Sequence, residues 1–100
     1  MKIHHNKTKI IATWGPSCED KKVMTEMIKS GLDLFRFNFS HGTHEKHLEG
    51  FKKVRQITTE LEASIGILAD LQGPKIRVGK VLDNNQPLKA GHTITITTEE

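Results

Sequence analysis

The stretch that decides the fold ends an apolar run that begins at Leu32, and it reads Arg36-Phe37-Asn38-Phe39-Ser40-His41-Gly42. Successive side chains of a β-strand point to opposite faces. Arg36, Asn38 and Ser40 therefore share one face of a strand predicted over 32–39, and the two phenylalanines lie on the other face. The phenylalanine face suits a buried core. The face with the cation and the polar side chains suits an anion.

A second stretch of this kind follows further along the chain and reads Asp70-Leu71-Gln72-Gly73-Pro74-Lys75-Ile76-Arg77. It comes directly after another apolar run, 65–69, which we predict to be a strand buried on both faces. The stretch combines a carboxylate, a tight Gly-Pro turn and two cations. Ligands of α/β proteins bind at the carboxyl ends of parallel strands. We therefore expect the two polar stretches to converge on one charged ligand.

The remaining elements up to residue 70 follow the order strand, helix, strand, helix, strand. A short apolar run, 9–13, stops at a Gly-Pro pair and is predicted to be the first strand. Ser17 and Asp20 form a capping-box pattern, which predicts a helix of roughly a dozen residues closed by Gly31. Thr43 is predicted to cap a second helix. The apolar stripe of that helix consists of Leu48, Phe51, Val54, Ile57 and Leu61. The pattern predicts an α/β fold with two right-handed crossovers.

The pattern changes after Arg77. Residues 78–82, a polar turn over 83–87 and the Thr/Ile alternation of 93–97 are typical of antiparallel β-structure. The last of these predicted strands has no partner in the sequence, and an unpaired edge strand is a poor end for a self-sufficient domain. We therefore expect a second architecture that begins after Arg77 and belongs to a longer protein.

Composition limits the classes of function. The 100 residues carry a net charge of +3, and 35% of them are hydrophobic. No run of Lys or Arg alternates with aromatic residues, so the sequence does not favour binding to nucleic acid or to a membrane. Cys18 is the single cysteine, and the sequence shows no signal-peptide pattern. We expect a cytoplasmic protein whose ligands are small anions.

Three segments resemble, in order and spacing, the start of the pyruvate kinase family: Thr8-Lys9-Ile10-Ile11-Ala12-Thr13-Trp14-Gly15-Pro16, the stretch 36–42, and Asp70 to Gly79. The resemblance runs from Lys7 to Leu82 and is weaker beyond. It implies a (β/α)8 TIM barrel as catalytic domain, with a smaller β-barrel lid inserted after the third strand. We therefore expect residues 1–78 to be the N-terminal portion of the barrel and residues 79–100 to be the start of the lid.

The resemblance also implies a reaction, the transfer of the phosphoryl group of phosphoenolpyruvate to ADP in glycolysis, which gives pyruvate and ATP. Arg36 matches the family arginine that contacts the transferred phosphoryl group, so it is predicted to be catalytic and to bind substrate. Arg77 matches a second catalytic arginine on the nucleotide side. The family segment that lies against the nucleotide phosphates matches Asn38, Phe39, Ser40 and His41.

Two expectations about metals follow from the resemblance. The acidic Mg²⁺ ligands of the family come from later strands, so the isolated chain is predicted to be inactive. The resemblance also implies that the parent protein is a homo-oligomeric enzyme. In many members K⁺ binds at the positions of Asn38, Ser40, Asp70 and the carbonyl of Leu71. Here the variable places of that motif hold Leu71, Gln72, Lys75 and Val78, as in the potassium-independent branch. The ammonium of Lys75 can replace K⁺ beside Asp70, which predicts an enzyme that needs Mg²⁺ but not K⁺.

Simpler interpretations exist for the same residues. Arg36 and Arg77 also suit structural ion pairs with Asp70, and Asn38 and Ser40 suit a turn in which they satisfy backbone groups. The chain as a whole also fits a free-standing small α/β module that binds phosphorylated metabolites or a partner protein without catalysis. A reading frame that continues into further βα units distinguishes the kinase from this module.

The other polar residues give weaker signals. Lys75 also suits an ordinary solvated position. His41, His44 and His47 recur every three residues, but residues two turns apart on a helix cannot all converge on one metal ion. We expect His44 and His47 to be exposed at the start of the second helix. Trp14 stands where the family usually has an aliphatic residue, and the sequence gives no account of it.

Overall fold

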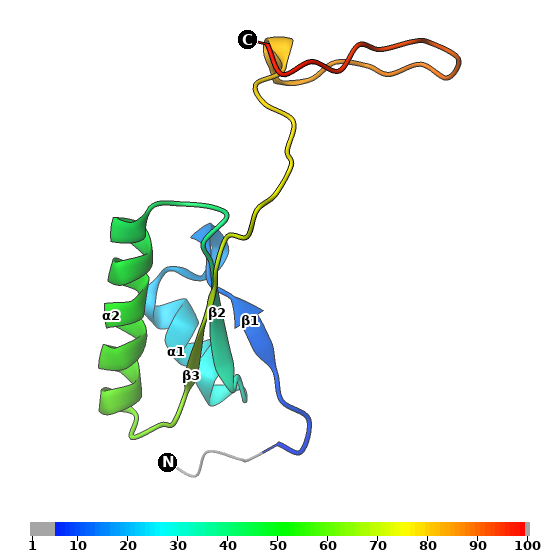
Figure 1. The fold of residues 1–100 in the computed structure, drawn as a ribbon. Coiled ribbons are helices and arrows are strands. Elements are labelled where there is room, and N and C mark those ends of the chain that lie inside the picture. Colours follow the sequence, from blue (N-terminus) through cyan, green and yellow to red (C-terminus); the bar gives the residue numbers. More distant parts are fainter. Residues whose placement is uncertain (1–5, 100) are drawn as a thin grey trace.

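The computed structural model describes residues 6–99, and its centre is a three-stranded parallel sheet. The strands are β1 (Ile11–Thr13), β2 (Leu34–Asn38) and β3 (Gly66–Asp70), in the spatial order β1-β2-β3 (Figure 1). The register places Thr13 opposite Arg36 and Asn38 opposite Asp70. The prediction of an α/β fold with parallel strands is confirmed, although β1 and β2 are shorter than predicted.

The strands are connected by helices, as predicted. Helix α1 (Lys21–Lys29) joins β1 to β2, and helix α2 (His44–Glu60) joins β2 to β3. A 3-10 helix, η1 (Pro16–Cys18), precedes α1, and a second, η2 (Leu82–Asn84), follows the sheet. No helix within residues 6–99 is long and apolar enough to cross a membrane.

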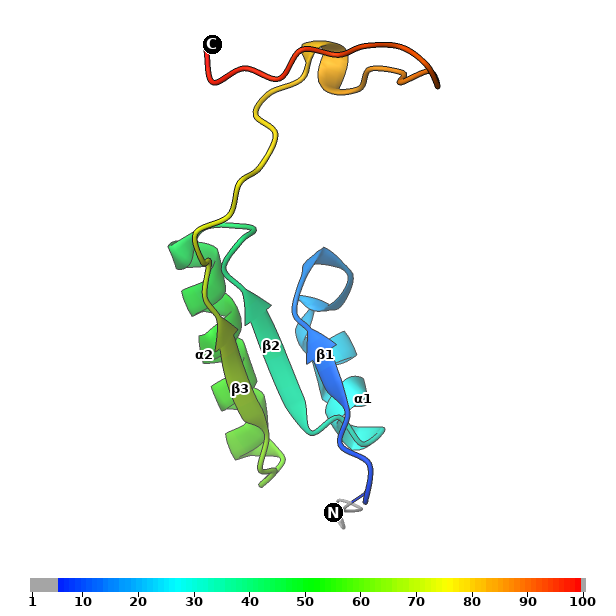
Figure 2. The same ribbon diagram turned by 45° about the vertical axis from the view of Figure 1, so that its right-hand side comes forward.

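Both α-helices pack on the same face of the sheet, and the opposite face is uncovered (Figures 1 and 2). The alternation predicted for β2 accounts for this arrangement. Phe35 and Phe37 point toward the helices and are buried, whereas Leu34, Arg36 and Asn38 are only half-buried. The polar face predicted from the sequence is therefore the uncovered face of the sheet. The prediction that the strand over 65–69 is buried on both faces is wrong, because only one face of β3 has helices packed on it (Figure 2).

The starts of the two helices differ in how well the sequence predicted them. Thr43 caps α2 as predicted, because its side chain accepts a hydrogen bond of 3.2 Å from the backbone N of Lys46. The capping box at Ser17 is wrong, since this residue lies inside η1. Asp20 is the cap of α1, and its carboxylate accepts hydrogen bonds from two backbone N–H groups. Residues 16–18 form the 3-10 helix η1 and cannot belong to α1, so α1 has 9 residues rather than a dozen.

The core lies between the sheet and the two helices. Its buried members are Trp14, Met24, Ile28, Leu32, Phe35, Phe37, Val54, Ile57 and Ile65. Of the stripe predicted for α2, Val54 and Ile57 are buried in this core and Leu61 packs against it. Leu48 and Phe51 stay 52% and 41% exposed, because they lie on the side of α2 that the sheet does not cover.

The side chain of Trp14 packs against Gly50 of α2. Its ring is 6% exposed and stacks on Phe37 with 5.3 Å between ring centroids. Both rings lie so close to α2 that a Cβ added to Gly50 would stand 2.7 Å from each of them. The indole is therefore accommodated because the helix carries no side chain at that point.

Residues 71–99 leave the sheet and extend away from it (Figures 1 and 2). Apart from η2, this segment contains no helix or strand, so the antiparallel β-structure predicted over 78–82 and 93–97 is wrong for these residues as described. Ile94 and Ile96, the apolar members of the alternation, are 57% and 90% exposed. An alternating pattern becomes a strand only when a partner strand and an apolar surface are in reach, and the segment finds neither.

Candidate functional site

Three polar side chains meet at the carboxyl ends of the three strands. The guanidinium of Arg36 on β2 donates from Nε to Oδ2 of Asp70 on β3, at 3.0 Å, and its Nη2 contacts the same oxygen. On the other side Nη1 donates to the hydroxyl of Thr13 on β1, also at 3.0 Å. Because the three residues come from the three parallel strands, the sheet itself fixes this group.

The guanidinium remains available to a ligand. Arginine has five N–H donors, and contacts within the described part of the chain engage three of them, which leaves one on each Nη. The side chains of Arg36 and Asp70 are 31% and 45% exposed. A partly exposed ion pair contributes only about 0–1 kcal/mol, so a phosphate competes well for such a cation. Two free donors in one plane suit bidentate binding of phosphate oxygens.

The loop after β2 lies beside this cation. The backbone N of Ser40 donates to Oδ1 of Asn38 at 3.0 Å, and the backbone N of His41 donates to the Asn38 carbonyl at 3.2 Å. The backbone N of Phe39 donates to the carbonyl of Asp70 at 3.0 Å, which ties the loop to the end of β3. The turn interpretation of Asn38 therefore holds, and the same contacts fix the loop next to Arg36.

Lys75 extends the site from the segment after β3. Its Nζ donates to the hydroxyl of Ser40 at 3.0 Å. Within residues 6–99 it forms no ion pair with Asp70, and the cation beside that carboxylate is Arg36. Lys75 thus contacts Ser40 directly, and the proposal that its ammonium replaces K⁺ beside Asp70 stays a prediction.

The structure brings together most of the predicted site residues. Arg36, Asn38, Phe39, Ser40, Asp70 and Lys75 lie around the carboxyl ends of β2 and β3. Leu71 follows directly after β3 and is 73% exposed. Arg77 lies in the extended segment and makes no ion pair among the described residues, so the ion-pair alternative holds for Arg36 alone.

Two residues near the site were missed or misplaced by the sequence analysis. Thr13 was not predicted to take part, although its place at the end of a strand next to a Gly-Pro turn is a usable signal. His47 was predicted to be exposed, but it is 8% exposed and its Nε2 lies 2.6 Å from the carbonyl oxygen of His41. Within residues 6–99 no group of three or more His, Cys, Asp or Glu residues is placed to hold a metal ion.

These features define a class of protein: an α/β unit with helices on one face of a parallel sheet and a cationic, polar group of side chains toward the carboxyl ends of its strands. A family profile described as "Pyruvate kinase, barrel domain" matches residues 5–100. The chain belongs to the pyruvate kinase family.

Individual relatives agree with this assignment. Pyruvate kinase 2 of Synechocystis is 48% identical over 94 residues, which are 92% of this chain and 16% of the relative. Pyruvate kinase of Thermococcus litoralis is 42% identical over 100 residues, which are 100% of this chain and 21% of the relative. A crystal structure of Cryptosporidium parvum pyruvate kinase is similar with a TM-score of 0.66 and 38% identity, over 73% of this chain and 15% of that one. The chain thus spans about a fifth or less of the length of these relatives.

Proposed function

We propose that this chain is the N-terminal part of a pyruvate kinase, which transfers the phosphoryl group of phosphoenolpyruvate to ADP and yields pyruvate and ATP. The observation that carries the proposal is the guanidinium of Arg36, held by Asp70 and Thr13 with two donors free. Phosphoryl transfer depends on positioning and on neutralisation of the charge on the moving group. A cation fixed by three strands provides both without reorganisation.

In this proposal, different residues of the site bind the two substrates, phosphoenolpyruvate and ADP. Arg36 binds phosphoenolpyruvate and stabilises the transferred phosphoryl group. The loop residues Asn38, Phe39, Ser40 and His41 lie against the phosphates of ADP, and their mutual hydrogen bonds support a fixed loop there. Arg77 serves as a second catalytic arginine on the nucleotide side once the segment that carries it packs against the rest of the enzyme.

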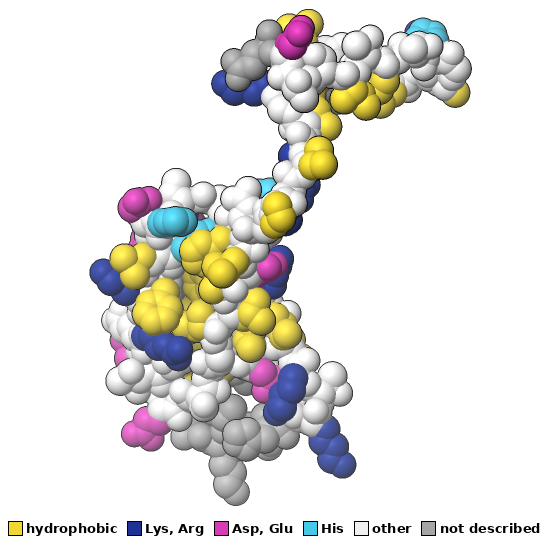
Figure 3. All heavy atoms as spheres, viewed as in Figure 1, with side chains coloured by type: hydrophobic (Ala, Val, Ile, Leu, Met, Phe, Trp, Pro, Cys, Tyr) yellow, Lys and Arg dark blue, Asp and Glu magenta, His cyan; other side chains and the backbone are white. Residues whose placement is uncertain are grey.

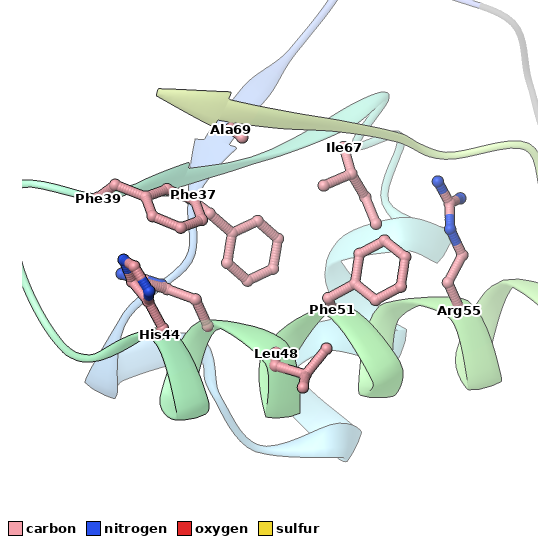
Figure 4. A pocket seen from close by; sticks show the side chains of 9 residues that line it. Phe37, Phe39, His44, Leu48, Phe51, Arg55, Ile67 and Ala69 are labelled. Carbon is pink, nitrogen blue, oxygen red and sulfur yellow. The ribbon is translucent and has the colours of Figure 1, made fainter. Parts of the chain in front are cut away.

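We also propose that the sheet is the first part of a (β/α)8 barrel, with residues 1–78 in the barrel and 79–100 at the start of a β-barrel lid. The uncovered face of the sheet supports this proposal, because it would form the barrel interior. The helix-covered side of the sheet also has an open apolar groove. Apolar side chains gather there (Figure 3), over a groove of about 430 Å³ between α2 and β3 (Figure 4). Leu48 and Phe51 of α2 and Ile67 of β3 line it, where the helix that follows β3 in such a barrel would pack.

The chain does not supply a full set of ligands for the Mg²⁺ of the proposed reaction. Asp70 is the carboxylate at the strand ends, and it already accepts two hydrogen bonds from Arg36. A Mg²⁺ site usually needs one or two free carboxylates, so the Mg²⁺ ligands belong to residues outside this chain, and we expect the chain alone to be inactive. Bound Mg²⁺ supplies charge neutralisation for the phosphate oxygens.

In this proposal, donors of the chain itself take the place of a monovalent cation. The hydroxyl of Ser40 accepts from Lys75, and Oδ1 of Asn38 accepts from a backbone N–H group. With Asp70, which accepts from Arg36, three of the four oxygen groups that K⁺ uses in the family thus already have donors. This supports an enzyme that does not require K⁺. We further propose a cytoplasmic, homo-oligomeric enzyme of glycolysis.

The test is formation of ATP from phosphoenolpyruvate, ADP and Mg²⁺, run on the complete gene product and on residues 1–100 alone. We expect activity only in the complete product, at similar rates in K⁺ and in tetramethylammonium. Absence of activity from both would refute the proposed reaction. A large rise with K⁺ would leave the reaction standing and refute the role of Lys75. Lys75→Glu, which removes the ammonium and places a carboxylate beside Ser40, is the matched variant and should create a K⁺ requirement.

A further inference from the structure

His47 occupies an unusual place at the start of α2. Its ring is buried, and its Nε2 lies 2.6 Å from the carbonyl oxygen of His41. A carbonyl oxygen only accepts hydrogen bonds, so Nε2 carries the proton and donates. The other ring nitrogen, Nδ1, is buried and has no hydrogen-bond partner among residues 6–99. The Nε2–H group of His47 therefore holds the loop through the carbonyl of His41, and this is the hydrogen bond that the ring makes within residues 6–99.

The ring is fixed by aromatic neighbours on several sides. It lies against Phe39 with 4.6 Å between ring centroids, and it meets the rings of Phe37 and Trp14 edge-on at 6.0 and 6.2 Å. Edge-on and offset aromatic pairs are favourable arrangements. His47 is thus held by the core, and it in turn contacts Phe39 of the loop.

The loop that receives this hydrogen bond turns at Gly42, whose φ of +74° is a left-handed conformation that glycine adopts readily. The hydrogen bond to His41 closes the turn immediately before that glycine. Asn38 and the backbone N of Phe39 fix the other end of the same loop. Without His47, the backbone of His41 itself would keep, among the described residues, only its N–H bond to the Asn38 carbonyl.

We propose that His47 is a positioning residue, which holds the loop from Phe39 to Gly42 in the shape that receives the phosphates of ADP. It touches no reacting atom in this proposal. It acts through the carbonyl of His41 and the ring of Phe39. The inference rests on the proposed function, since the nucleotide role of the loop belongs to that proposal.

Two substitutions in the complete gene product separate positioning from packing. His47→Leu fills the core without a donor, whereas His47→Gln keeps an N–H group at a similar reach. A net hydrogen bond is worth a factor of roughly three to ten in an equilibrium. We therefore expect His47→Leu to raise the KM for ADP about three- to tenfold, with kcat and the KM for phosphoenolpyruvate changed less than about twofold. His47→Gln should recover most of the loss. Lys52→Ala, at an exposed position further along the same helix, is the control and should change none of these constants.

Hydrogen exchange of the loop supplies a measurement that does not need activity. His47→Leu should make the amides of residues 41 and 42 exchange about three- to tenfold faster, with the second half of α2 unchanged. An unchanged KM for ADP in an active His47→Leu enzyme would overturn the inference. So would a His47→Gln enzyme as impaired as His47→Leu, or unchanged loop exchange. If the wild-type product makes no ATP, the proposed function fails, and the exchange rates alone decide whether His47 holds the loop.

Discussion

Replacing Gly50 by alanine should destabilise the contact between α2 and the sheet, although alanine is the better helix former. Gly50 is buried in the middle of α2. A Cβ there would lie 2.7 Å from Cε1 of Phe37 and 2.7 Å from Cε2 of Trp14, whereas ordinary contacts begin at 3.4 Å. The two rings stack on each other in the core, so neither can swing away freely.

The magnitude follows from two opposing terms. To restore ordinary contact, α2 or both rings must move by about 0.7 Å, the difference between 3.4 and 2.7 Å. Overpacking of this kind costs about 1–3 kcal/mol, and two clashes at once place Gly50→Ala in the upper half of that range. Alanine recovers about 1 kcal/mol of helix propensity. We therefore expect a net loss of about 1–2 kcal/mol in the local stability of α2.

Hydrogen exchange measured by mass spectrometry on peptides from α2 and β2 tests this expectation. A loss of about 1–2 kcal/mol corresponds to exchange about 5- to 30-fold faster in the Gly50→Ala variant. The double variant Trp14→Leu, Gly50→Ala should lose less than the sum of the two single variants, because a smaller side chain makes room for the Cβ. Lys52→Ala, on the exposed side of α2, is the control. Slower exchange in Gly50→Ala would show that helix propensity outweighs the close contact and would refute the reasoning.

Three further changes test other contacts. Thr43→Ala removes the cap of α2 and should cost about 1 kcal/mol, measured by the exchange rates of the first turn, with Thr43→Ser retaining most of the stability. The hydrogen bonds from Lys21, and secondarily from Gln56, lower the pKa of Glu60, so this link between α1 and α2 contributes above pH 4.5 and is lost as the pH falls through the lowered pKa. Lys21→Met should raise that pKa toward its usual value in an NMR titration, and an unchanged titration would contradict the contact. Thr13→Val removes a support of Arg36 and should lower kcat/KM for phosphoenolpyruvate about three- to tenfold in the complete gene product, with Thr13→Ser close to wild type.

The fold of residues 9–70 was largely predictable because local patterns and tertiary packing agree there. The alternation around Arg36 fixes which face of β2 is buried, and this face is the same in the structure. The cap at Thr43 is a local interaction, so sequence alone locates it. The cap at Ser17 failed because Pro16 starts a 3-10 turn, which shifts the start of α1 to Asp20.

The parts that depend on distant partners were less predictable. His47 looked exposed because it lies in the first turns of a polar helix, and only the aromatic rings from β1 and β2 bury it. The strand predicted over 93–97 needs a neighbour that residues 6–99 do not supply. The neighbourhood of Arg36 and Asp70 follows from the sequence, since Asp70 ends β3 and Arg36 lies two residues before the end of the adjacent β2. The hydrogen bonds of Arg36 to Asp70 and of Lys75 to Ser40 depend on side-chain conformations, which the sequence pattern does not specify.

Trp14 also gives these 100 residues an optical property of their own, because it is the single tryptophan among them. A buried indole emits at shorter wavelength than one in water. This indole lies on Phe37 and edge-on to His47, which in turn contacts the loop after β2. A change of that loop that moves His47 therefore changes the surroundings of the fluorophore, so the emission of Trp14 reports on the site without any added label.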